Sequence, residues 1–229
     1  MGIAPIVRSW VLGTLLAVLI LGIPGLYYRY TFDHARRLRI VTEGKFYRSG
    51  QLTAAGFRDA QLRYQIKTVI NLQEDVKEPR IKEWAFGKPA VQQSEVLAGI
   101  GVNSISLDGG LMDSTQAGGR PVVIDEFLEV IDGIRDQYWK KGLPHAILIH
   151  CAAGLHRTGL FTAIYRIEYE NRSLSEVIEE LKANGFGNYK ATDANDYIKL
   201  YLLDYRKGLR WPGGKPAKPS PKPAEGGGP

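Results

Sequence analysis

The stretch "AILIHCAAGLHRTGLFTAIYR", residues 146–166, decides the fold of this 229-residue chain. Its first five residues form an apolar run that ends in His150, a pattern that predicts a buried strand. The chain's only cysteine, Cys151, follows directly, and a helical pattern begins near Arg157. A buried strand, a glycine-containing loop and a helix are typical of phosphate sites, because loop N–H groups converge there and the helix N-terminus carries positive potential.

Cys151 and Arg157 are candidates for chemistry on a phosphoryl group. The planar guanidinium of Arg157 can hold two phosphate oxygens at once. The same positive field favours the thiolate form of Cys151, which is the nucleophilic form. Gly154 and Gly159 allow backbone angles and close approaches that other residues resist. A lone cysteine is more often a small buried apolar residue, but the complete pattern H-C-x-x-G-x-x-R-T-G argues against that interpretation.

Residues 150–159, "HCAAGLHRTG", resemble the signature loop of the cysteine-dependent protein tyrosine phosphatase superfamily. "FYRSGQLTAAGF" (46–57), followed by "IKTVINL" (66–72), is similar to the dual-specificity-like branch, and the resemblance extends over residues 38–205. It implies an α/β fold with a central, mainly parallel sheet flanked by helices. It implies neither a metal nor any other cofactor.

The resemblance also implies a role for each residue of the loop. Cys151 would form a phosphocysteine intermediate, and Arg157 would bind the phosphate and stabilise the transition state. The hydroxyl of Thr158 would help the thiolate to leave, and His150 would orient the loop and tune the thiol. The residues whose backbone would surround the phosphate are Ala152, Ala153, Gly154, Leu155, His156 and Arg157.

The resemblance further requires an aspartate that acts as the general acid for the leaving oxygen. The segment "SISLDGGLMDST" offers two candidates, Asp108 and Asp113. We expect Asp108 to be the acid, because it lies at a strand end before two glycines that suit a mobile loop. Asp113 is the alternative, and Glu74 and Asp75 after the "VINL" strand come next.

Alternating strand and helix patterns surround this stretch. Strands are expected in "RIVTEGKFYRSG" on both sides of a Glu-Gly-Lys turn, in "KTVINL", in "VNSISL" and in "HAILIHC". Helices are expected at 53–65, in part of 78–100, in "VVIDEFLEVIDGIRDQYW", and at 156–171, 174–184 and 192–207, with a capping box in "SLSE" at 173–176. Such alternation independently predicts an α/β fold with a mainly parallel sheet.

Twenty uncharged residues separate Arg8 from Arg29. As a helix they span roughly 30 Å, the thickness of a bilayer core, and Pro24 and Gly25 should break or kink that helix. A cleaved signal peptide is the alternative. Four arginines within residues 29–39 against one at Arg8 predict a cytoplasmic catalytic domain. The expected segments are a flank (1–8), a transmembrane anchor (9–28), a basic juxtamembrane segment (29–39), a phosphatase domain (40–210) and a disordered Pro/Gly/Lys-rich tail (211–229).

Charge restricts the partners. Residues 40–212 hold 22 Lys/Arg and 22 Asp/Glu, which argues against nucleic acid. The loop contains no lysine, and His156 adds charge only when protonated, so a highly phosphorylated ligand is disfavoured. We expect phosphotyrosine or phosphoserine/threonine proteins as substrates, with a membrane phospholipid or small phosphoester as the alternative. A non-catalytic phosphate reader and a sulfurtransferase are weaker alternatives, because the cysteine, the arginine and the R-T-G sequence are all present.

Overall fold

The computed structural model describes residues 5–73, 78–83, 88–107, 122–186, 201–203 and 205–208. Two compact units are interleaved along the chain. Unit 1 consists of Met1–Ile70, Glu78–Ile105 and Ala146–Gly154, and unit 2 of Asn71–Lys77, Ser106–His145 and Leu155–Pro229. The boundary between the units falls inside the loop of residues 151–157, which we call the Cys151 loop.

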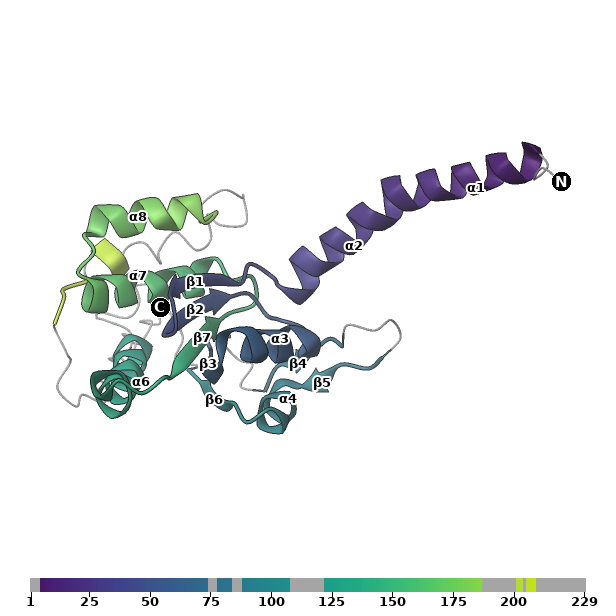
Figure 1. Ribbon diagram of the computed structural model, residues 1–229. Coiled ribbons are helices and arrows are strands. Elements are labelled where there is room, and N and C mark those ends of the chain that lie inside the picture. Colours follow the sequence, from purple (N-terminus) through teal and green to yellow (C-terminus); the bar gives the residue numbers. More distant parts are fainter. Residues whose placement is uncertain are drawn as a thin grey trace, which may run out of the picture. The chain divides into compact units, whose positions relative to one another are not determined.

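A five-stranded sheet organises unit 1 (Figure 1). Its strands are β1 (Arg39–Thr42), β2 (Phe46–Ser49), β7 (Ala146–His150), β3 (Ile66–Asn71) and β6 (Asn103–Ser106), in that spatial order. β1 and β2 form an antiparallel hairpin whose turn contains Gly44 at φ 71°. β2 runs parallel to β7, with Ser49 opposite His150. The predicted central, mainly parallel sheet is confirmed, and the strand that ends before Cys151 lies in its middle.

Two helices cover this sheet with apolar side chains. α3 (Ala54–Tyr64) begins at Thr53, whose hydroxyl accepts a hydrogen bond from the Gly56 N–H at 3.0 Å, and α4 (Gln93–Gly99) follows later in the chain. Their buried residues form one core cluster with the strands, comprising Tyr47, Leu52, Ala54, Phe57, Ala60, Ile66, Val69, Ile81, Val96, Leu97, Val102, Ala146 and Leu148. In the segment 78–100 the helix begins only at Gln93; before it, β4 (Arg80–Ile81) and β5 (Val91–Gln92) form a separate antiparallel pair.

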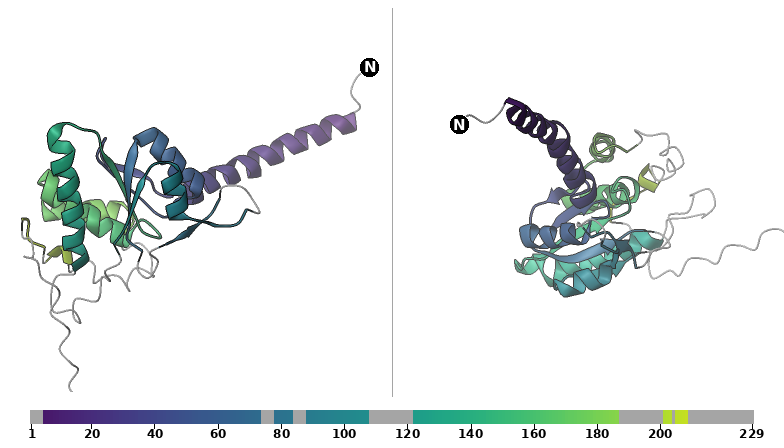
Figure 2. Two further views of the ribbon diagram at one scale, coloured as in Figure 1. Left: turned by 90° about the horizontal axis from the view of Figure 1, so that it is seen from below. Right: turned by 90° about the vertical axis from the view of Figure 1, so that its right-hand side faces the viewer.

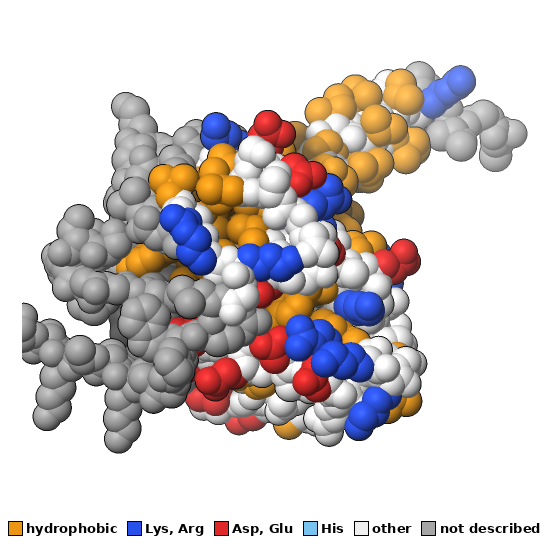
Figure 3. All heavy atoms as spheres, turned by 90° about the vertical axis from the view of Figure 1, so that its left-hand side faces the viewer, with side chains coloured by type: hydrophobic (Ala, Val, Ile, Leu, Met, Phe, Trp, Pro, Cys, Tyr) orange, Lys and Arg blue, Asp and Glu red, His pale blue; other side chains and the backbone are white. Residues whose placement is uncertain are grey.

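A long apolar helix forms the N-terminal part of unit 1. It comprises α1 (Pro5–Ala17), the π-helical turn η1 (Val18–Gly22), α2 (Ile23–Arg29) and the π-helical turn η2 (Tyr30–His34). Residues Val7–Phe32 have a mean hydropathy of 2.0 and are long and apolar enough to cross a membrane. Their side chains are exposed, as the apolar surface of the projecting helix in Figure 3 shows. The helix does not break at Pro24, because the wider η1 turn, in which Ile23 N–H bonds to Val18 O, precedes the proline.

Unit 2 contains α6 (Val122–Gln137), the 3-10 turn η3 (Trp139–Lys141), α7 (His156–Glu170) and α8 (Leu174–Ala183). Figure 2 shows two further views of them. The predicted apolar face of α6 is buried, and its Phe127 meets Phe161 of α7 edge-on at 5.0 Å. The predicted capping box is confirmed, since Ser173 and Glu176 bond reciprocally at the start of α8.

The C-terminal predictions are only partly covered by the described residues. Of the helix predicted at 192–207, residues 201–203 are helical, whereas 205–208 are not. The tail at 211–229 lies outside the described residues. The segment boundaries proposed after residues 8, 28, 39 and 210 stay predictions.

Candidate active site

Cys151 occupies the first position after the buried strand β7. Its side chain is buried, and only 7% of the residue is exposed. The backbone N–H of Gly154 donates a hydrogen bond to Sγ of Cys151 at 3.2 Å. The loop therefore turns back so that one of its own backbone N–H groups faces the sulfur.

Gly154 allows the loop to turn back on the sulfur. Its φ is +72°, in the left-handed region, and a Cβ there would lie 2.5 Å from Gly50 N and 2.7 Å from Ser49 C. Both the backbone angle and the close approach therefore require glycine. Gly159 differs, because it lies within α7 and its N–H bonds to Leu155 O.

Three consecutive carbonyls of the Cys151 loop accept hydrogen bonds from residues outside the loop. Ala152 O accepts from the backbone N–H of Gln51 at 3.1 Å. Ala153 O accepts from Arg37 Nη1 at 3.1 Å, and Gly154 O accepts from Arg48 Nη2 at 2.9 Å. Because a trans peptide points its C=O and N–H in opposite directions, these contacts turn the N–H groups of the same peptide units toward the opposite side.

Sequence reasoning missed the side chains that make these contacts. Arg48 is only 4% exposed and lies within β2, a strand that is buried throughout. An arginine inside an apolar strand is unusual, since arginines are almost never fully buried without a partner, and that anomaly in "FYRS" was an available signal. Arg37 and Gln51 lie in loops and gave no comparable signal.

His150 is fixed by a chain of glutamines. Gln51 Nε2 donates a hydrogen bond to Gln93 Oε1 at 2.8 Å, which fixes the orientation of the Gln93 amide. The Gln93 amide nitrogen then donates to His150 Nε2 at 3.1 Å. Complete burial lowers the pKa of His150 to about 4. His150 is therefore neutral at physiological pH, with Nε2 as its acceptor nitrogen.

In unit 2, α7 begins at the second half of the Cys151 loop. Its N-cap is Leu155, whose apolar side chain cannot accept the first N–H groups of the helix. Arg157 Nη1 donates to Leu72 O at 3.1 Å, which fixes the arginine against the residue that follows β3. The Oγ1 of Thr158 is buried and has no hydrogen-bond partner among the described residues, so this hydroxyl retains a donor for a ligand or a sulfur.

His156 contributes no fixed charge. Its ring lies edge-on to Phe186, with 5.5 Å between the ring centroids. Burial lowers the pKa of His156 below its usual value, and the nearby charge of Arg157 lowers it further. Arg157 is therefore the charged side chain of the residues from Cys151 to Arg157.

The candidates for the general acid lie outside the described residues. This holds for Asp108, Asp113, Glu74 and Asp75. The structure does describe how the chain enters the segment with the two preferred aspartates. Leu107 N–H bonds to Asn71 O at 2.9 Å, and the Asn71 side chain bonds to Gln73 N–H and Ser106 Oγ. Sequence reasoning missed Asn71, whose amide at the end of the apolar run "VIN" was the only signal.

Within the described parts of the chain, no three His, Cys, Asp or Glu side chains gather where they could hold a metal ion.

The chain is similar in sequence and in fold to known proteins. The dual specificity protein phosphatase TpbA of Pseudomonas aeruginosa, from strains UCBPP-PA14 and PAO1, is 39% identical over 65 residues. That match spans 28% of this chain and 28% of the relative, so the chain matches little more than a quarter of the relative's length. The core catalytic domain of the PP-IP phosphatase SIW14 from S. cerevisiae is similar in fold, with a TM-score of 0.52 at 19% identity over 77% of this chain and 89% of that chain.

The match to a family profile is more extensive than the match to TpbA. The profile of the tyrosine phosphatase family aligns with residues 30–166, which include the sheet strands and the whole Cys151 loop. The resemblance inferred from "HCAAGLHRTG" is confirmed: the chain belongs to the tyrosine phosphatase family.

Proposed function

We propose that this chain hydrolyses phosphomonoesters through a phosphocysteine intermediate on Cys151. The observation that carries the proposal is the N–H of Gly154 directed at the Cys151 sulfur, in a loop whose carbonyls are bound from outside. The N-terminus of α7 supports it as well, because no side chain caps it and a helix N-terminus favours an anion.

In the first step, the thiolate of Cys151 attacks phosphorus and an S–P bond forms. The bond from phosphorus to the ester oxygen breaks, and that oxygen takes its proton from Asp108, the proposed general acid. Arg157 and the loop N–H groups stabilise the charge on the phosphoryl oxygens. The leaving group departs as an alcohol or a phenol.

In the second step, water attacks the phosphocysteine while Asp108, now a carboxylate, accepts a proton from it. The S–P bond breaks, phosphate leaves and the thiolate is restored. We assign the buried, unpartnered hydroxyl of Thr158 to this step, as a donor to the departing sulfur. The balance over both steps is one phosphomonoester and one water converted into one alcohol and one phosphate.

For the substrate we propose phosphotyrosine and/or phosphoserine/threonine in proteins. The low pKa of His156 and the lysine-free loop support a singly phosphorylated group, because they leave Arg157 as the charged side chain of the loop. A membrane phospholipid or small phosphoester is the competing substrate class. The apolar N-terminal helix favours the phospholipid, because an anchor of this length would hold the enzyme at a membrane.

We also propose that residues 9–28 form a single-pass anchor with the catalytic domain in the cytoplasm. The exposed apolar surface of the helix supports an anchor, and the excess of arginine after it supports that orientation. A reducing cytoplasm also protects a reactive thiol from oxidation.

The mechanism is tested with an aryl phosphate. Cys151→Ser is expected to abolish turnover while vanadate binding persists, and Arg157→Lys is expected to fail as well, because an ammonium group cannot make the bidentate contact. EDTA is expected to leave the rate unchanged. Turnover by Cys151→Ser, or inactivation by EDTA, would refute the cysteine mechanism.

The substrate class is tested separately by trapping. Full-length Cys151→Ser in detergent is expected to retain phosphoproteins that vanadate releases, as detected with phosphotyrosine and phosphoserine/threonine antibodies. Wild-type enzyme is assayed in parallel on vesicles that contain a phosphorylated lipid. Phosphate release from the vesicles, with no trapped phosphoprotein, would assign the lipid class instead.

A further inference from the structure

The four residues His34–Arg37 connect the apolar helix to the sheet in an unusual conformation. Arg36 has a φ of 26° and Arg37 a φ of 59°, so two consecutive non-glycine residues have positive φ. Such backbone angles cost free energy and persist only where surrounding contacts enforce them. The contacts made by His34–Arg37 therefore indicate what the conformation is for.

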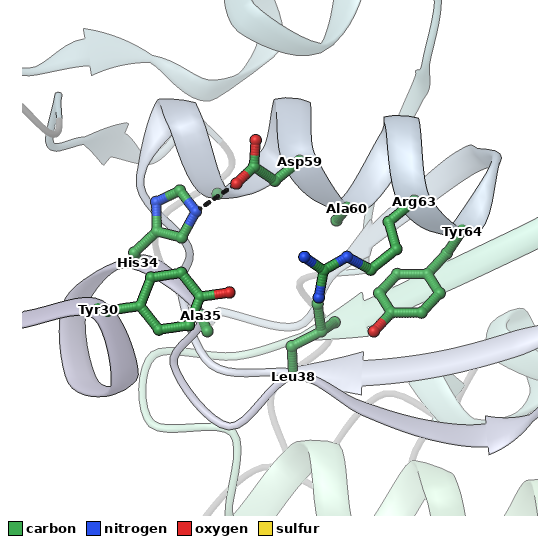
Figure 4. A pocket seen from close by; sticks show the side chains of 9 residues that line it. Tyr30, His34, Ala35, Leu38, Asp59, Ala60, Arg63 and Tyr64 are labelled. Carbon is green, nitrogen blue, oxygen red and sulfur yellow. Dashed lines mark hydrogen bonds and ion pairs between the residues drawn. The ribbon is translucent and has the colours of Figure 1, made fainter. Parts of the chain in front are cut away.

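One set of contacts fixes the segment to α3. His34 is 7% exposed, and its Nε2 pairs with Asp59 Oδ2 at 2.8 Å while its Nδ1 lies 3.3 Å from the hydroxyl of Thr53. Figure 4 shows the imidazole directed at Asp59 beside a recess that Tyr30, Leu38 and Tyr64 also line. The His34 carbonyl lies so close to α3 that a Cβ on Gly56 would be 2.3 Å from it.

A second set of contacts fixes the segment to the Cys151 loop. Arg36 O accepts a hydrogen bond from Gly50 N–H at 2.8 Å. Gly50 is enclosed between the two, because a Cβ there would lie 2.9 Å from Arg36 Cγ and 3.1 Å from the Ala153 carbonyl. Arg37 Nη1 then donates to Ala153 O at 3.1 Å.

The contact of Arg37 is made to one particular peptide unit. The peptide that joins Ala153 to Gly154 has its C=O bound to Arg37 and its N–H bound to Cys151 Sγ. Because the peptide is planar, a donor that holds the carbonyl also sets the direction of the N–H. Arg37 therefore acts on the nucleophile through the two ends of a single rigid group.

We propose that His34–Arg37 is a positioning segment for the Cys151 loop and that Arg37 is its positioning residue for phosphoryl transfer. The inference rests on the proposed function. Arg37 touches neither the sulfur nor the phosphoryl group; it keeps the Gly154 N–H directed at the place where charge develops. The apolar helix ends at His34, so the same four residues link a candidate membrane anchor directly to catalysis.

The test compares Arg37→Ala with Arg39→Ala in the full-length chain, reconstituted in detergent or nanodiscs. Arg39 lies two residues further on, carries the same charge and begins β1 with an exposed side chain. We expect Arg37→Ala to lower kcat on an aryl phosphate about tenfold, the usual effect of one hydrogen bond from a charged donor, with KM changed less than about twofold. Vanadate affinity should fall in parallel. Arg39→Ala should match wild type in both.

A conservative variant separates positioning from folding. Arg37→Lys keeps a charged donor that can reach one carbonyl and is expected to restore most of the kcat that Arg37→Ala loses, at an unchanged melting temperature. Wild-type kcat in a folded Arg37→Ala, equal losses in both alanine variants, or a failed rescue by folded Arg37→Lys would each overturn the inference. Wild-type protein that hydrolyses no phosphoester would refute the proposed function instead, and vanadate affinity would still test the role of Arg37.

Discussion

The Cβ position of Gly154 lies 2.5 Å from the backbone nitrogen of Gly50, closer than any side-chain carbon can approach. The loop after β2 and the loop after β7 are thus in backbone-to-backbone contact beside the nucleophile. The neighbouring parallel strands bring them there, since Ser49 and His150 are opposite each other in the register. The sulfur site therefore depends on the backbone of two segments and not only on the loop that carries the cysteine.

Replacing Gly154 with alanine is expected to damage both stability and catalysis. The added methyl group must displace the backbone around Gly50, and alanine is strained at a φ of +72°. We expect the free energy of unfolding to fall by about 1–3 kcal/mol and kcat/KM to fall at least about tenfold, because the N–H that faces Cys151 moves. Denaturant unfolding and aryl phosphate kinetics measure the two effects.

Gly133 provides the matched control. It lies within α6, and nothing is within 4 Å of the position its Cβ would take. Gly133→Ala should stabilise the protein by about 0.5–1 kcal/mol through helix propensity and leave kcat/KM unchanged. A Gly154→Ala enzyme that behaves like Gly133→Ala would contradict the close approach of the two loops.

The burial of His150 predicts a loss of stability in mild acid. Its pKa is about 4 in the folded protein and about 6.5 when unfolded, so between these values the unfolded chain binds the extra proton. The free energy of unfolding must therefore fall as pH drops from about 6.5 to about 4, by roughly 3 kcal/mol from this group alone. Urea unfolding at a series of pH values measures it.

His150→Asn isolates this contribution, because the variant retains other titrating groups such as His156. The wild type should lose roughly 3 kcal/mol more than the variant between pH 7 and pH 4. Parallel pH profiles for the two proteins would show that His150 is not buried in its neutral form. Gln93→Ala, which removes the donor to His150 Nε2, should lower kcat without removing the pH-dependent loss of stability.

Local patterns predicted the elements that carry the nucleophile. The apolar run before Cys151 became β7, and the helical spacing after it became α7. The Glu-Gly-Lys turn, the Thr53 start of α3 and the capping box at Ser173 depend on neighbouring residues and were likewise predictable. The short strands β4 and β5 were missed, because two residues are too few to show a period.

The supporting contacts of the site could not be predicted in the same way. Arg37 and Ala153 are 116 residues apart in sequence, Arg48 and Gly154 are 106 apart, and Gln93 and His150 are 57 apart. Each pair meets only because the chain folds back on itself, which no local pattern encodes. The left-handed backbone at Arg37 was equally hidden, since arginine has no preference for positive φ.

The proposed general acid predicts a dependence on the leaving group. Asp108→Asn should reduce kcat/KM roughly a hundredfold for esters whose leaving alcohol or phenol has a high pKa, because these need a proton as they depart. It should have little effect on nitrophenyl-type esters, which leave as anions. A series of aryl phosphates of graded leaving-group pKa measures the slope of log kcat/KM against that pKa.

Asp113→Asn is the matched variant for this series, because it removes the same charge from the same segment. If Asp113→Asn shows the steep leaving-group dependence and Asp108→Asn does not, the acid is Asp113. If neither variant changes how kcat/KM depends on the leaving-group pKa, Glu74 and Asp75 become the candidates for the general acid.

The orientation of the chain is the last property that the N-terminal segment predicts. One arginine precedes the uncharged stretch 9–28, whereas four follow it within residues 29–39, so the positive-inside rule predicts a catalytic domain in the cytoplasm. For full-length protein expressed in a bacterium, protease added to intact spheroplasts should leave residues 40–210 undigested, and lysis should expose them. Mass measurement should find the intact apolar segment. A mature chain trimmed near residue 25, or a catalytic domain digested from outside, would establish export and leave the chemistry of Cys151 unaffected.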